Sequence, residues 1–185
     1  MQENYPDNAA KKSRRPRKDI SAWEQTLRWL DAKWYSERKL REKLNKLHYP
    51  VSEIDDVIAK CREYGLVNDE ALAGDFAQSQ SSRGRGPRRI AMELYRHGLT
   101  GDAARKALEN IAGDEENSCK TALKSKLSSW KNEPDWRKRR EKAFRFLANR
   151  GYNLDVIYQT LDEEPDLNYR PGNEFDSEFI AAPDE

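Results

Sequence analysis

Basic side chains gather in two short segments of the chain, and these are its best candidates for contacts with an anionic partner. Residues 83–89 (RGRGPRR) hold four arginines at a break that precedes an expected helix. Guanidinium groups beside the free N–H donors of a helix start suit phosphate or carboxylate. The second segment lies in a helix expected to begin near Pro134, where Lys138, Lys142 and Arg145 share a face. Such contacts predict salt-sensitive binding without base recognition, and a plain basic turn and solvated helix face are the alternative.

Residues that could catalyse a reaction are few. The two histidines, His48 and His97, are expected at equivalent helix ends, where the helix dipole favours a positive imidazole. Cys61 and Cys119 each fall in an expected helix without a second thiol nearby, which predicts buried reduced thiols. The RGRG sequence lacks the GK[ST] ending and the preceding strand of a phosphate loop. The sequence therefore predicts a protein that is not an enzyme and that has neither a metal site nor a cofactor.

The hydrophobic pattern predicts an all-α protein. Charged and hydrophobic residues each make up 36% of the 185 residues, and the apolar ones recur at helical spacing without long alternation. Similar stretches occur at residues 49–58, 99–108 and 152–161, which indicates tandem units of three helices each. We expect three such repeats in tandem. They are predicted to span residues 21–65, 66–112 and 113–162.

The helices of the first repeat have recognisable starts. Ser21, Ser36 and Ser52 are predicted to cap them. The first helix is predicted to bury one apolar stripe, made of Trp23, Leu27, Leu30 and Trp34. This spacing favours core packing of the tryptophans over stacking on nucleic-acid bases, and it leaves Trp29 off the stripe.

The two ends of the chain differ in charge. Residues 1–20 are predicted to be a disordered basic arm, and residues 163–185 a disordered acidic tail. From residue 162 onward there are nine acids and one base, so this end carries −8 and the remainder +9 of a net +1. A basic body with an acidic tail suggests a polyanionic partner, and a solvated surface with a solubility tail is the alternative. The tail is a candidate to fold back on the basic faces and compete with DNA phosphate.

Several segments resemble the RecX family. Residues 83–94 (RGRGPRRIAMEL) resemble its hallmark, Gly-x-Gly-Pro-x-Arg-Ile-x-x-Glu-Leu, through Gly84, Gly86, Pro87, Arg89, Ile90, Glu93 and Leu94. Residues 65–76 are similar to the lead-in to that motif, and residues 35–44 and 146–152 are similar to segments of the first and third repeats. The departures are Leu72, where the family usually has an aromatic residue, and Gln78 and Gln80, where it often has arginines.

This resemblance implies that the three repeats form an elongated, curved array and that the protein is a regulator of the RecA recombinase. Such a protein binds RecA and its single-stranded DNA filament, blocks filament growth, and lowers ATP hydrolysis, strand exchange and coprotease activity. From charge and helix face, the expected contacts are Arg85, Arg88, Arg89, Lys138, Arg139, Lys142 and Arg145. The alternatives are a direct, largely sequence-independent DNA-binding helical module and a protein–protein adaptor acting through the tail. A cytoplasmic protein is expected, because no apolar segment resembles a signal peptide or a membrane span. We also expect it to be a monomer.

Overall fold

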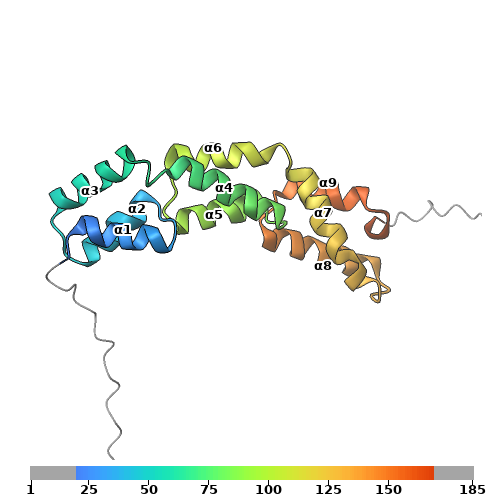
Figure 1. Ribbon diagram of the computed structural model, residues 1–185. Helices are drawn as coiled ribbons and strands as arrows, with labels where there is room; N and C mark the ends of the chain where they lie inside the picture. The colour runs from blue at the N-terminus through green and yellow to red at the C-terminus, as the bar shows by residue number, and fades with distance from the viewer. Residues whose placement is uncertain (1–19, 169–185) are drawn as a thin grey trace, which may run out of the picture. The chain divides into compact units, whose positions relative to one another are not determined.

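The computed structural model describes residues 20–168, and every regular element in that range is a helix. The chain divides into two compact units on either side of the bond between Asn68 and Asp69. The first unit contains α1 (Ala22–Ala32), α2 (Glu37–Lys46) and α3 (Val51–Glu63). The second contains α4 (Asp69–Ser82), α5 (Pro87–Arg96), α6 (Gly101–Ala112), α7 (Glu115–Leu127), α8 (Trp136–Arg150) and α9 (Leu154–Glu163), with the 3₁₀ helices η1 (Ser128–Trp130) and η2 (Pro165–Leu167). The prediction of tandem three-helix repeats is confirmed (Figure 1).

Serine hydroxyls cap the N-termini of the first two helices, as predicted. The hydroxyl of Ser21 accepts a hydrogen bond from the N–H of Glu24, and that of Ser36 accepts one from Lys39. The prediction for Ser52 is wrong, because α3 already begins at the preceding residue and its N-cap is a proline without a side-chain hydrogen bond. Side chains thus cap two of the three helix starts of the first repeat.

The buried face of α1 differs from the predicted apolar stripe. Ala22 and Thr26 are fully buried, whereas Leu27 is 38% and Trp34 is 74% exposed. The Thr26 hydroxyl donates to the carbonyl of Ala22 at 2.8 Å, so a polar side chain enters the core with its hydrogen bond made. Trp29, left off the stripe, packs against this core. The predicted stripe is therefore wrong at Leu27 and Trp34.

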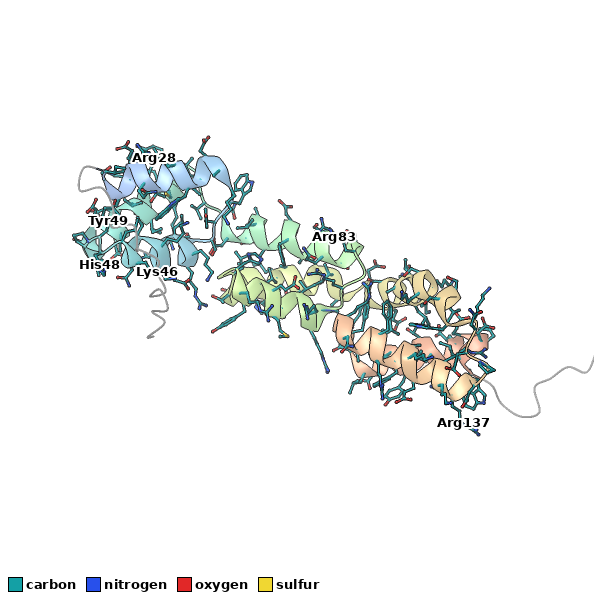
Figure 2. The ribbon with its side chains drawn as sticks, turned by 90° about the horizontal axis from the view of Figure 1, so that it is seen from below. Arg28, Lys46, His48, Tyr49, Arg83 and Arg137 are labelled. Carbon is teal, nitrogen blue, oxygen red and sulfur yellow. The ribbon has the colours of Figure 1, made fainter. Side chains whose placement is uncertain are left out.

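The middle helix of each repeat ends in a left-handed residue. His48, Gly98 and Gly151 have φ angles of 63°, 79° and 85°, and each N–H donates to the carbonyl three residues earlier. Figure 2 shows His48 beside Tyr49 at the end of α2. His97 has a right-handed conformation one position before Gly98. His48 thus corresponds to the glycines of the other repeats, and its predicted equivalence with His97 is wrong by one residue.

Replacing His48 by glycine should stabilise the protein. We expect His48→Gly to raise the free energy of unfolding by about 1 kcal/mol, since glycine adopts the left-handed conformation without the steric cost of a Cβ. His97→Gly should lower it, because His97 is right-handed and its ring lies 5.0 Å from that of Phe76. Urea unfolding followed by circular dichroism measures both changes. Changes of the same sign in the two variants would contradict this account.

The second and third repeats are joined through main-chain contacts. The N–H of Gly86 donates to the carbonyl of Arg150 at 2.8 Å, and the N–H of Arg88 donates to the carbonyl of Gly151 at 3.0 Å. A Cβ atom on Gly86 would lie 2.3 Å from the carbonyl carbon of Gly151. Only a glycine permits this approach, so Gly86 fixes the start of α5 against the end of α8.

We expect Gly86→Ala to lower the free energy of unfolding by about 2 kcal/mol or more, because the added methyl group must push the two backbones apart and break their hydrogen bonds. Gly74→Ala is the matched control, since Gly74 lies inside α4 and a Cβ there meets nothing within 4 Å. That variant should gain about 0.5–1 kcal/mol. Thermal and urea unfolding measure both, and an unchanged stability of Gly86→Ala would refute the role of this contact.

The third repeat continues past the predicted boundary at residue 162. Leu167, in η2, is fully buried, and the Arg140 guanidinium donates to its carbonyl at 3.3 Å and to that of Leu161 at 3.1 Å. Residues 163–168 therefore belong to the packed unit. Residues 1–19 and 169–185 lie outside the described range, so the disorder predicted for them stays a prediction.

Candidate partner-binding surface

The contact between Gly86 and Gly151 brings the two basic segments predicted from the sequence together. The arginines at the start of α5 lie beside the end of α8, and the two helices follow one another along the same side of the second unit (Figure 1). With 15 residues, α8 extends the basic region by about 22 Å beyond this junction.

Two of the predicted arginines share one carboxylate. Arg85 and Arg89 both form ion pairs with Glu93, whose side chain is only 13% exposed. Burial raises the pKa of this carboxyl, but the hydrogen bonds and positive charges of Arg89 and Arg85 outweigh burial, so the pKa of Glu93 lies below its ordinary value. The ion pairs orient both guanidinium groups, and the two arginine side chains remain 38% and 44% exposed.

Arg88 is held by a network that reaches into the third repeat. Its Nε donates to the side-chain oxygen of Asn153 at 3.0 Å. Asn153 in turn donates from its main chain and its side-chain amide to the carboxylate of Glu115, at 2.8 and 2.7 Å. Because Glu115 is buried, this network orients Arg88 on the surface.

Along α8 the positive charge is concentrated. The helix has seven basic residues and one acid, a net charge of +6. Lys138, Lys142 and Arg145 are exposed, although Lys142 pairs with Glu133 and Arg145 with Glu141. These ion pairs are solvent-exposed and weak, so an anionic partner can displace them.

Arg139 differs from the other predicted contacts. Its guanidinium donates to the main-chain carbonyls of Glu133 and Asp166, at 3.1 and 3.2 Å. Its Nε is buried and has no hydrogen-bond partner within residues 20–168. Arg139 therefore holds the loop before α8 and η2 in place, and its predicted contact with a partner stays a prediction.

The backbone N–H groups of the RGRGPRR segment are not free to bind an anion, contrary to the prediction. The N–H groups of Gly86 and Arg88 are already donated to carbonyls of the third repeat, so the expectation of free donors at this helix start is wrong. Arg150 uses the same segment, since its guanidinium donates to the carbonyls of Arg83 and Gly84 at 3.1 and 2.8 Å. Anions must be bound here through side chains.

An exposed face of α5 was missed in the sequence. Arg88, Met92 and Tyr95 are spaced i, i+4 and i+7, so they lie along one side of the helix. Met92 is 54% and Tyr95 is 62% exposed. The spacing was visible in the sequence, but apolar residues at this interval also mark a buried stripe, so exposure had to come from the structure. We define the α5–α8 surface as Arg85, Arg88, Arg89, Met92, Tyr95, Lys138, Lys142 and Arg145.

The two thiols, the potential metal ligands and the apolar helices were also considered as sites of other kinds. Cys61 and Cys119 are buried and unpaired, and burial raises the pKa of both thiols. No group of three potential metal-binding side chains occurs within the described part of the chain. Between residues 20 and 168, no helix is both long and apolar enough to cross a bilayer.

Comparison with known proteins places the three repeats in one family. The RecX first, second and third three-helix domains match residues 22–61, 68–108 and 114–161. The chain belongs to the RecX family. It is 33% identical over 154 residues to the regulatory protein RecX of Syntrophotalea carbinolica, covering 80% of this chain and 98% of the relative. It is 31% identical over 135 residues to that of Chromohalobacter salexigens, covering 73% and 87%.

Solved RecX structures share the fold. The crystal structure of RecX from Lactobacillus salivarius superposes with a TM-score of 0.69 at 21% identity, covering 77% of this chain and 93% of that chain. A second crystal structure of a regulatory protein RecX gives a TM-score of 0.67 at 22% identity, covering 77% and 72%.

Two departures from the RecX pattern lie on α4. Gln78 is exposed, and Gln80 is 8% exposed with its side-chain oxygen accepting no hydrogen bond from the described residues. Neither glutamine carries a charge, and α4 contains no lysine or arginine.

The ion pairs of Glu93 should give the protein a pH-dependent stability. Because its pKa is lowered on folding, its contribution is fully present above the ordinary glutamate pKa of about 4.3 and is lost as the pH falls through the lower value. We expect Glu93→Gln to cost about 1 kcal/mol at pH 7.

Urea unfolding at several pH values from 7 down to 3 measures the difference between the wild type and Glu93→Gln, which should shrink toward acid pH. Glu109→Gln is the control, because its carboxylate is 59% exposed and pairs with Arg105 at the surface of α6. It should change stability by only a few tenths of a kcal/mol. A Glu93→Gln difference that is constant with pH would show that charge is not its cause.

Proposed function

We propose that this chain binds the RecA recombinase on single-stranded DNA through the α5–α8 surface, and that it inhibits growth of the filament. ATP hydrolysis, strand exchange and coprotease activity of RecA would fall as a consequence. Membership in a family of regulatory proteins supports the regulatory role. RecA as the partner is what the family resemblance implies, and the chemistry of the surface suits a complex of protein and nucleic acid.

The observation that carries this proposal is the exposed face of α5. Tyrosine, methionine and arginine are enriched where proteins bind proteins, and Arg88, Met92 and Tyr95 supply one of each. Naked DNA would need the cations but would gain less from an exposed methionine. A surface that combines these side chains with the charge of α8 suits a complex of protein and nucleic acid.

Direct binding to DNA is the second candidate, and the first unit supplies the observation that favours it. Trp34 is 74% exposed, and the Lys43 ammonium lies 4.2 Å from the centre of the Trp29 ring and 4.6 Å from that of Tyr35. Aromatic rings beside cations suit single-stranded nucleic acid. This mode of binding would not depend on Met92 or Tyr95.

The two candidates are separated by the variant Met92→Ser/Tyr95→Ser. With the protein well below the RecA concentration, we expect the wild type to inhibit single-stranded-DNA-dependent ATP hydrolysis. The concentration of the variant needed for the same inhibition should be at least about tenfold higher, since two interface side chains are lost. Its affinity for naked single-stranded DNA, titrated at the same salt concentration, should stay within about twofold, because no charge is removed.

The matched control is Val51→Ser/Tyr64→Ser, which removes side chains that are 69% and 63% exposed in the first unit. It should inhibit like the wild type. The proposal would be contradicted if the wild type inhibited only when the DNA is saturated and the Met92→Ser/Tyr95→Ser variant inhibited equally well. That result would favour direct DNA binding.

A further inference from the structure

An aromatic groove lies between α8 and α9. Its volume is about 450 Å³, which is within the range of sites that take small ligands or side chains. Trp136 and Phe144 from α8 and Tyr158 from α9 line it, and the rings of Phe144 and Tyr158 are 5.4 Å apart. Tyr158 is 51% exposed, so the groove presents aromatic surface to solvent.

Four charged residues also line the groove, and its two acids, Asp162 and Glu141, are paired with Arg140 and Arg145. The Arg137 guanidinium is exposed and lies 5.2 Å from the centre of the Trp136 ring, and Figure 2 shows Arg137 at the start of α8. Arg140 also lines the groove but pairs with Asp162 at 2.6 Å. A ligand that combines aromatic rings with carboxylates would match this site.

The end of the described chain forms part of the groove wall. Asn168 lines the groove, and its side-chain amide donates to the carbonyl of Asp162 at 2.6 Å. The two preceding residues are held to α8, since Arg139 donates to the carbonyl of Asp166 and Arg140 to that of Leu167. The remaining 17 residues, 169–185, therefore start at the groove itself.

These 17 residues have the composition that the groove requires. Phe175 is flanked by Glu174 and Asp176, and Phe179 follows Glu178. Phe175 is seven residues beyond Asn168, so an extended chain reaches about 23 Å, the length of α8. Either phenylalanine can therefore reach the groove.

We propose that the acidic tail of residues 169–185 docks in the groove of its own chain. A phenylalanine would pack against the rings of Trp136, Phe144 and Tyr158, and the neighbouring carboxylates would pair with cations of α8. The docked tail would then compete with a polyanionic partner for the α8 side of the α5–α8 surface. The docking itself does not depend on the proposed function, whereas its regulatory consequence rests on it.

The first test removes the rings and keeps every charge. In the full chain, Phe175→Ala/Phe179→Ala should bind a labelled oligothymidylate about tenfold more tightly at low salt. A short tether supplies an effective concentration of about 1 mM, so a docking constant near 0.1 mM would leave the tail bound about nine-tenths of the time. Tyr158→Ala, on the groove side, should have the same effect, and combining the two changes should add nothing.

The control Tyr64→Ala removes a tyrosine with comparable exposure from the first unit and should leave the affinity unchanged. Docking is refuted if Phe175→Ala/Phe179→Ala leaves the affinity for oligothymidylate unaltered while replacing the tail acids by amides raises it. The tail would then act by charge alone. RecA is absent from this assay, so failure of the proposed function would not affect the result.

The second test locates the tail. A photoreactive benzoylphenylalanine in place of Phe175 should cross-link, within one chain, to peptides of α8 and α9, and Tyr158→Ala should reduce the yield. Cross-links spread over the whole protein would overturn the proposal. So would cross-linked dimers whose yield rises with concentration, because the tail would then occupy the groove of a second copy.

Discussion

The second and third repeats meet where the N–H groups of Gly86 and Arg88 donate to the carbonyls of Arg150 and Gly151. This contact requires two backbones to approach more closely than any side chain allows. It determines where α5 begins and where α8 ends, and every residue of the α5–α8 surface lies on one of these helices or beside their junction. The glycines of the RGRGPRR segment therefore serve packing, and its arginines are the candidate contacts for a partner.

The surface that results is ordered before any partner arrives. Glu93 holds Arg85 and Arg89, and the buried Glu115 holds Arg88 through Asn153. Fixing long side chains in advance lowers the entropy that binding must remove. Along α8, by contrast, the ion pairs are exposed and easily exchanged. The surface thus joins a rigid region on α5 to an adaptable one on α8.

The same helix α8 takes part in two proposed interactions. Its exposed cations face a polyanionic partner, while Trp136 and Phe144 line the groove beside the start of the acidic tail. A chain with a basic body and a tail of opposite charge can regulate its own binding at short range, since a tether keeps the tail concentrated near the groove. Arg139 and Arg140 hold residues 166 and 167 to α8, and this fixes the point from which the tail starts.

The sequence by itself determined the helical class, the three repeats and the caps at Ser21 and Ser36, because hydrophobic periodicity and capping are local properties of the chain. Family membership was also visible in it, through the motif at residues 83–94. Only the tertiary structure decided that the N–H groups of Gly86 and Arg88 are already bonded, that Arg139 donates to main-chain carbonyls, and that Met92 and Tyr95 are exposed. Those outcomes depend on which neighbour covers a given side of a helix, and periodicity describes each helix alone. Arginines look alike in a sequence whether they hold a carbonyl or face solvent, so the surface could be expected in outline but not residue by residue.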